Sequence, residues 1–490
     1  MRITRSLWAA LGVAACLSTV AQADVKLPNV IGSNMVLQRE MPLPVWGWAD
    51  AGEEVSVTMG EATAKTAAGA DGKWMVKLPA MKAGGPHTVT VSGKNKIELT
   101  NILVGEVWVG SGQSNMEWSV GQSNNPQEEI AAAKYPKIRL FNVAPKKTTA
   151  IDPQNDVNPA VVWTDCSPAT ISNFSAVAYF FGRHIHAELD VPVGLINTSW
   201  GGTRVEPWTP PEGFALVEDP AVKAIGENAT KAQAAFHAAV AKAKADGQPE
   251  PKSNVGAGTP VALYNANVHP LVPFAIRGAL WYQGESNRGE GMQYAIKKQA
   301  LIGGWRKVWG QGDFPFLSVQ LAPYTYGGSE VALPEIWEAQ TSLLKSVPNT
   351  GMCVTTDITN LKDIHPKNKQ DVGKRLALWA LANTYGKKDL VYSGPLYKSM
   401  KVDGQKVSLD FDHVGGGLVA RDGKELSWFT VAGESGEFVE AKAEISGSSV
   451  VVWSDKVEKP TAVRFGWHQL AEPNLMNKEG LPASPFRTSK

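Results

Sequence analysis

Short alternating runs of apolar and polar residues fill the first hundred positions of the chain. Residues 54–59, 74–78 and 87–91 each place alternate side chains on one face, as a half-buried strand does. Turn-forming pairs such as Asp71-Gly72 separate these runs. The pattern predicts a β-sandwich-like module over residues 24–102.

The pattern changes at residues 102–109, where a nearly continuous apolar run leads into the turn at residues 110–116. Such a run is typical of a parallel strand that is buried on both faces. Helix-like segments alternate with further strand-like runs, which lie at residues 138–141, 193–197, 276–282 and 316–320. The alternation predicts an α/β domain with a mainly parallel sheet over residues 103–390, and the Ala- and Lys-rich residues 219–246 predict one or two surface helices.

Beyond residue 390 the chain returns to short β-branched runs, at residues 407–411, 428–431, 449–453 and 461–465. These runs predict a second β-sandwich-like module over residues 391–490. A chain of 490 residues is longer than a single hydrophobic core usually accommodates, which agrees with this division into three parts.

The N-terminus has the features of an export signal. Two arginines precede an apolar stretch at residues 7–20, and Ala21-Gln22-Ala23 has the small-x-small form of a cleavage site. Residues 1–23 are therefore interpreted as a signal peptide, and the mature protein as periplasmic or extracellular. A lipobox-like run before Cys16 is the competing interpretation, with an acyl anchor on that cysteine. No later segment reaches the ~20 apolar residues of a spanning helix, so no integral membrane segment is expected in the mature chain.

Composition narrows the possible partners. The formal net charge is +1 and no lysine- and arginine-rich run is interleaved with aromatics, which argues against nucleic acid. The 17 tryptophans suit stacking on sugar rings, although tryptophan also fills cores. Cys166 and Cys353 form either one disulfide or two buried thiols in the mature chain. The sequence does not indicate an oligomeric state.

Ser114 directly follows the apolar run, at the carboxyl end of the expected strand. In an open parallel sheet, reactive groups lie in the crevice beyond these strand ends. Ser114 is either a nucleophile awaiting a base or an N-cap of the following helix. Met116 stands where the nucleophile elbow of α/β-hydrolases has its second glycine, which points away from that superfamily. No histidine pair, cysteine cluster or Gly-rich phosphate loop has the required spacing, so neither a metal nor a cofactor is expected.

Four blocks in order, at residues 110–117, 197–208, 281–287 and 363–366, resemble those of the sialate O-acetylesterases, a family of the SGNH hydrolases. The resemblance implies a flavodoxin-like SGNH hydrolase domain between the two β modules. It also implies a serine esterase that removes O-acetyl groups from a carbohydrate through an acetyl-enzyme intermediate.

The same resemblance assigns the catalytic roles. Ser114 matches the nucleophile and His365 its base. Asp363 is the favoured orienting acid, but it lies two residues before His365, whereas many SGNH hydrolases place their aspartate three before the histidine. Asp357, or a dyad supported by a backbone carbonyl, therefore stays an alternative.

The expected oxyanion donors are the Ser114 N–H, a glycine N–H from Gly202 rather than Gly201, and a side-chain amide from Gln283 or Asn287. We interpret Glu285 as a buried hydrogen-bonding strut. The loop of the second block supplies candidates for sugar contact, with structural roles equally open for at least two of them: Trp200, Arg204, Glu206 and Trp208.

Two other functions compete with the esterase. A carbohydrate-binding protein on an inactive esterase fold would use the tryptophans and β modules, but the intact Ser114 and His365 argue against it. A lipase or peptidase is disfavoured by the four blocks and by the absence of an obvious apolar lid. The acetylated glycan stays open between sialic acid and hemicellulose-type polymers. His269, without a clear partner, is interpreted as a loop or packed histidine.

Overall fold

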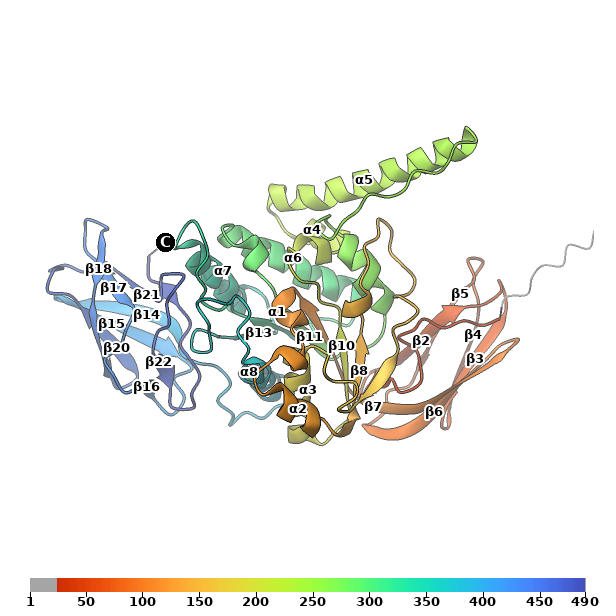
Figure 1. The fold of residues 1–490 in the computed structure, drawn as a ribbon, viewed down its shortest axis with the longest axis horizontal. Coiled ribbons are helices and arrows are strands. Elements are labelled where there is room, and N and C mark those ends of the chain that lie inside the picture. The colour runs from red at the N-terminus through yellow and green to blue at the C-terminus, as the bar shows by residue number, and fades with distance from the viewer. Residues whose placement is uncertain (1–23, 490) are drawn as a thin grey trace, which may run out of the picture.

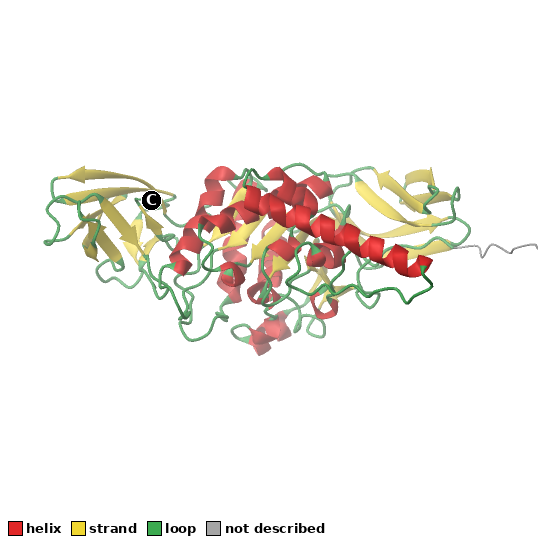
Figure 2. Cartoon of the chain, turned by 90° about the horizontal axis from the view of Figure 1, so that it is seen from above, coloured by secondary structure: helices red, strands yellow, loops and turns green. Residues whose placement is uncertain are grey.

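The computed structural model describes residues 24–489 and shows a central α/β domain with a β module at each end (Figures 1 and 2). The predicted signal peptide at residues 1–23, with Cys16, lies outside the described residues. Among the residues that are described, no helix is long and apolar enough to span a membrane.

The central sheet has seven strands in the order β13-β12-β11-β7-β10-β8-β9, all parallel except the edge strand β9. β7 lies inside this sheet, with β10 and β8 on one side and β11, β12 and β13 on the other. The mainly parallel sheet is thus confirmed. Its strands are β7 (Lys96–Gly112), β8 (Tyr135–Asn142), β9 (Trp163–Cys166), β10 (Val193–Asn197), β11 (Gly278–Tyr282), β12 (Phe316–Val319) and β13 (Thr350–Cys353).

Helices lie on both sides of this sheet (Figure 1). α3 packs against α8, and α6 against α4 and α7. Trp305 of α6 meets Trp281 of β11 edge to face, with 6.2 Å between ring centroids. The helices are α1 (Ser114–Glu117), α2 (Pro126–Ala132), α3 (Ala176–Leu189), α4 (Pro211–Leu216), α5 (Pro220–Ala245), α6 (Met292–Trp309), α7 (Ala332–Ser346) and α8 (Lys369–Asn383). Short helical turns are η1 (Val120–Gln122), η2 (Ala144–Lys146), η3 (Glu206–Trp208), η4 (Tyr264–Val268), η5 (His269–Leu271) and η6 (Glu285–Asn287).

Residues 219–246, which were expected to hold one or two surface helices, form the single helix α5, and one end of this helix extends away from the central domain (Figure 1). It begins after Asp219, whose side chain accepts a hydrogen bond from the Val222 N–H. Only Val222 and Gly226 of this helix are buried. Its alanine and lysine content suits a helix that is mostly in water.

β7 joins the N-terminal module to the central domain. Its first half pairs antiparallel with β6, and its second half pairs parallel with β10 and β11. Partial exposure along the strand gives way to continuous burial at Ile102. The expected border between residues 102 and 103 therefore falls inside one strand. The other strands of the module are β1 (Val36–Gln38), β2 (Leu43–Trp48), β3 (Glu54–Met59), β4 (Ala62–Ala67), β5 (Lys73–Leu78) and β6 (Gly84–Ser92).

The two β modules differ in how they are packed. The N-terminal module and the central domain share one hydrophobic core, where Trp46 of β2 meets Phe274. The C-terminal module has a core of its own, between two four-stranded antiparallel sheets. Its strands are β14 (Leu396–Asp403), β15 (Lys406–Asp412), β16 (Leu418–Ala420), β17 (Phe429–Ala432), β18 (Phe438–Glu440), β19 (Lys442–Ser446), β20 (Ser449–Trp453), β21 (Ala462–Phe465), β22 (Leu475–Asn477) and β23 (Phe486–Arg487).

Both described cysteines, Cys166 and Cys353, are free thiols. Burial raises the pKa of each to about 12. A thiol held in its protonated form is a poor nucleophile, so both side chains act as core residues.

Candidate active site

Ser114 begins α1 at the carboxyl end of β7. The turn before it requires Gly112, which has a φ of +136° and whose missing Cβ would lie 2.2 Å from the Tyr282 carbonyl oxygen. Gln113 secures the turn on both sides, because its N–H donates to Tyr282 and its side-chain oxygen accepts from the Gly284 and Ser286 N–H groups. The N–H of Ser114 is an unpaired donor among the described residues, as expected at a helix start.

His365 reaches Ser114 from the loop between β13 and α8. Its Nε2 lies 2.9 Å from the Ser114 Oγ, which is hydrogen-bonding distance. The Trp118 ring stacks on the imidazole, with 4.6 Å between centroids and 14° between planes. The two residues predicted as nucleophile and base, 251 positions apart, are therefore brought together in the geometry that proton transfer needs.

The two candidate acids are in different positions. Asp363 Oδ1 lies 3.6 Å from the His365 Nδ1 and accepts a hydrogen bond from the His365 N–H at 2.9 Å. Both oxygens of Asp357 bind the guanidinium of Arg375, at 2.7 and 2.6 Å. Asp363 thus faces the imidazole, whereas Asp357 is held in a bidentate ion pair with α8.

The second block lies against the nucleophile. A Cβ on Gly201 would lie 3.3 Å from the Ser114 Cβ, so this glycine permits the close approach. The Gly201 N–H is already used, because it donates to the Glu117 carboxylate at 2.6 Å. Gly202 has a φ of +74°, and its N–H has no acceptor among residues 24–489.

The two amides expected to serve the oxyanion are committed elsewhere. The Gln283 amide nitrogen donates to the Thr203 carbonyl and to the Asn287 side-chain oxygen. The Asn287 amide nitrogen donates to Glu206 and Glu290. Because each nitrogen carries two hydrogens, neither amide has a donor left in this structure. Both side chains instead hold the 203–206 loop in place.

Of the four residues expected to contact a sugar, two are buried and two are partly exposed. Trp208 is 0% exposed and its Nε1–H donates to the Thr203 hydroxyl, so its ring has no face open to a sugar in this structure and fits the structural role that was left open for it. Glu206 is also buried. Burial disfavours its ionisation, but hydrogen bonds from Lys297 and Arg204 outweigh burial and lower its pKa to about 2.

Arg204 and Trp200 keep partly exposed side chains. Arg204 contacts Glu206 and Glu290. The Trp200 ring lies 5.2 Å below the Lys147 ammonium, which also contacts Glu117. Trp200 is thus the tryptophan of the second block whose side chain still reaches solvent.

Comparison with known proteins decides the family. Residues 104–382 match the model of the carbohydrate esterases described as sialic acid-specific acetylesterases. The chain belongs to this family. It is similar to sialate O-acetylesterases from Rattus norvegicus (33% identity, covering 80% of this chain and 79% of the relative) and Homo sapiens (32%, 79% and 76%). It is also similar to a solved carbohydrate acetylesterase from Xanthomonas citri, with 37% identity, a TM-score of 0.84, and coverage of 95% of this chain and all of the other.

As a member of this family, the chain is a carboxylic ester hydrolase. The family blocks located Ser114, His365 and Asp363, which the structure places together. Several of their neighbours escaped sequence reasoning. Trp118 and Lys147 lie outside the four blocks and carry no spacing signal. The Glu117 contact with Gly201 joins residues 84 positions apart, so only the tertiary structure reveals it.

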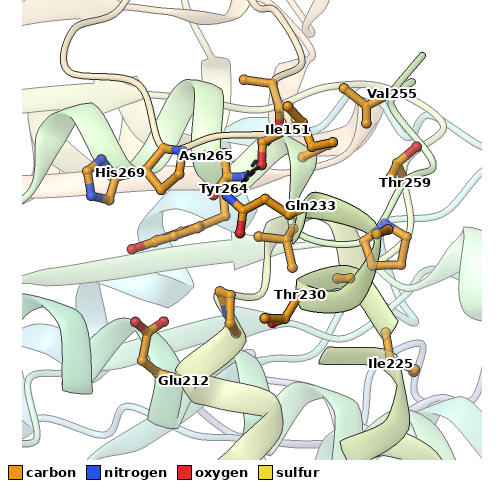
Figure 3. Close-up of a pocket in the computed structure, with 18 of the residues that line it drawn as sticks. Ile151, Glu212, Ile225, Thr230, Gln233, Val255, Thr259, Tyr264, Asn265 and His269 are labelled. Atoms are coloured by element: carbon orange, nitrogen blue, oxygen red, sulfur yellow. Dashed lines mark hydrogen bonds between the residues drawn. The ribbon is translucent and has the colours of Figure 1, made fainter. Parts of the chain in front are cut away.

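A cavity with a volume of about 880 Å³ lies beside α5 (Figure 3). Gln233 and Asn265 bind the Ile151 carbonyl at its wall. His269, at its edge, contacts the Gln154 carbonyl oxygen through Nδ1 at 3.0 Å and meets Tyr264 edge to face. Neither member of the Ser114–His365 pair lines this cavity. Within the described residues, no group of three or more His, Cys, Asp or Glu side chains is arranged to hold a metal ion.

Proposed function

We propose that the chain is a serine esterase of the SGNH class that removes O-acetyl groups from a carbohydrate. The 2.9 Å contact between the Ser114 Oγ and the His365 Nε2 is the observation that carries this proposal. His365 takes the hydroxyl proton as Ser114 attacks the acetyl carbonyl, and then returns it to the departing sugar oxygen. Water repeats the cycle on the acetyl-enzyme and releases acetate.

In this proposal Asp363 orients the imidazole. The oxyanion forms between the N–H groups of Ser114 and Gly202, because both are free donors among the described residues. A properly placed donor stabilises the transition state by roughly 3 kcal/mol. Trp200 and Arg204, both partly exposed on the loop beside Ser114, are the proposed sugar contacts.

The proposed substrate is an acetylated carbohydrate. Similar proteins are named sialate O-acetylesterase and carbohydrate acetylesterase, so acetylated sialic acid is one candidate substrate. An acetylated hemicellulose-type glycan is the other candidate that we propose. Residues 1–23 are proposed to direct export to the periplasm or beyond. Residues 391–490 are proposed to be a separate β module. The boundary between the N-terminal module and the catalytic domain is proposed to lie near residue 102, inside strand β7.

Acetate release tests the proposal directly. The purified chain is incubated with p-nitrophenyl acetate and with acetylated sialic acid, xylan, xyloglucan and pectin, and free acetate is measured. We expect hydrolysis of p-nitrophenyl acetate and of at least one glycan, and covalent labelling of Ser114 by a fluorophosphonate. Glycan binding without acetate release would instead support the carbohydrate-binding alternative.

The pH dependence follows from the environment of His365. Burial lowers the pKa of this imidazole, the Lys369 ammonium acts in the same direction, and Asp363 opposes both. The neutral imidazole is the base, so activity is lost as pH falls and the base is protonated. We expect kcat/KM for p-nitrophenyl acetate to rise with pH through an apparent pKa below 6.5 and then to level off. A pH–rate profile measures this, and a midpoint above 6.5 would contradict it.

A further inference from the structure

Lys369 is a buried lysine that bonds to Asn115, the residue next to Ser114. It is the first residue of α8, four positions after His365, and its side chain is 0% exposed. Its ammonium donates to the Asn115 side-chain oxygen at 2.6 Å and lies 5.1 Å from the centroid of the Tyr282 ring. Lysine is rarely fully buried, because its charge loses its hydration there.

Asn115 connects this cation to a carboxylate on another loop. Its amide nitrogen donates to the Glu285 Oε1 at 2.7 Å, while its oxygen accepts from Lys369. The other Glu285 oxygen is buried without a partner in the described structure. The amide thus links a buried ammonium to a buried carboxylate, and these two groups fix which way it faces.

The same amide reaches the catalytic loop. The Asn115 nitrogen also donates to the carbonyl of Ile364, the residue before His365, at 3.1 Å. Since Asn115 directly follows Ser114, one side chain joins the nucleophile's helix to the base's loop. We call the three linked side chains of Lys369, Asn115 and Glu285 the buried strut.

Burial disfavours the charged forms of both ionisable groups of the buried strut. Burial lowers the pKa of Lys369 to about 7, while Glu285 and Asp363 act to raise it. Burial also raises the pKa of Glu285. Replacing buried charges by apolar side chains is often neutral or favourable for stability, so stability gives little reason to keep them. Ionisable groups of this kind cluster at functional sites.

We propose that Lys369 is a positioning residue of the esterase reaction: through Asn115 and Glu285 it holds the His365 loop at hydrogen-bonding distance from Ser114. This inference rests on the proposed function. The groups that face His365 are the Ser114 hydroxyl, the Trp118 ring, the Asp363 carboxylate and the Lys369 ammonium. Lys369 is thus both the anchor of the loop and a charge acting on the imidazole.

These two effects can be separated with two variants. Lys369→Met removes the anchor and the charge, so we expect kcat for p-nitrophenyl acetate to fall about a hundredfold. The acidic limb of kcat/KM should also move up by roughly one pH unit, because a nearby positive charge no longer disfavours the imidazolium. Asn115→Ala removes the link but keeps the cation. We expect it to lower kcat by a similar factor and to leave the limb where it is.

Lys367→Met is the matched control, because Lys367 is an exposed lysine two residues before Lys369. We expect it to change neither kcat nor the pH limb. Thermal unfolding of each variant shows whether it is folded. Full turnover in folded Lys369→Met, or an unmoved pH limb in that variant, would overturn the inference. If Lys369→Met does not fold, full turnover in folded Asn115→Ala overturns it.

The Ser114→Ala variant separates this inference from the proposed function. Hydrolysis that survives Ser114→Ala overturns the proposed function and this inference together. Hydrolysis that is lost in Ser114→Ala but intact in Lys369→Met overturns only the role of the buried strut.

Discussion

Replacing Ser114 by alanine is expected to lower the turnover of p-nitrophenyl acetate by on the order of a thousandfold or more. The hydroxyl is the atom that attacks the ester, and its removal leaves His365 with no nucleophile to activate except water. Residual hydrolysis would come from the remaining N–H donors and from substrate binding. Steady-state kinetics over a range of ester concentrations measures the change in kcat.

Ser119→Ala is the matched control for this variant. Ser119 lies five residues further along the chain, and its hydroxyl donates to the Gln122 side-chain oxygen. We expect its turnover to stay close to that of the unmodified protein, and both variants to unfold at similar temperatures. Turnover in Ser114→Ala equal to that in the control would remove Ser114 from the mechanism.

Asp363→Asn is expected to lower kcat by about a hundredfold or more, whereas Asp357→Asn is not. An amide at position 363 cannot stabilise the imidazolium that forms during the attack, and loss of this carboxylate has been the costly change in triads of this type. The effect is smaller than for Ser114→Ala, because the 3.6 Å separation from the His365 Nδ1 is longer than a strong hydrogen bond.

Asp357→Asn should change stability instead. Asp357 and Arg375 form a buried bidentate ion pair. Removing one partner of such a pair typically lowers the free energy of unfolding by about 3–5 kcal/mol. Denaturant unfolding measures this loss, and kcat of the folded fraction should stay close to that of the unmodified protein. Equal losses of kcat in the two variants would contradict the assignment of Asp363 as the orienting acid.

The order of secondary structure could be predicted, because it depends on local patterns. The apolar run ending at Val109 predicted a buried parallel strand, and the structure has one. The strand continues back to Lys96, and this was missed because residues 96–101 alternate like an edge strand of the first module. Pairing partners change along β7, and a one-dimensional pattern does not record the change.

The site could be predicted only to the level of which residues meet. Ser114 and His365 were found because they lie in blocks that resemble those of the sialate O-acetylesterases. The roles of Gln283 and Trp208 depend on side-chain partners: one amide is used by Thr203 and Asn287, and one ring is buried beneath the same loop. Residue type alone shows neither the partners of the Gln283 amide nor the burial of the Trp208 ring. The buried strut was only partly visible, since Glu285 was expected to be a hydrogen-bonding residue while its links to Asn115 and Lys369 depend on tertiary packing.

The shared strand β7 affects how this enzyme can be rearranged by evolution or by engineering. The strand that ends beside Ser114 begins in the N-terminal module, and both parts are packed into one core. A recombination event or a truncation near residue 102 would cut the strand that carries the nucleophile. The C-terminal module has a core of its own, so we expect its removal to leave the core around Ser114 intact, whereas removal of the first module would cut into that core.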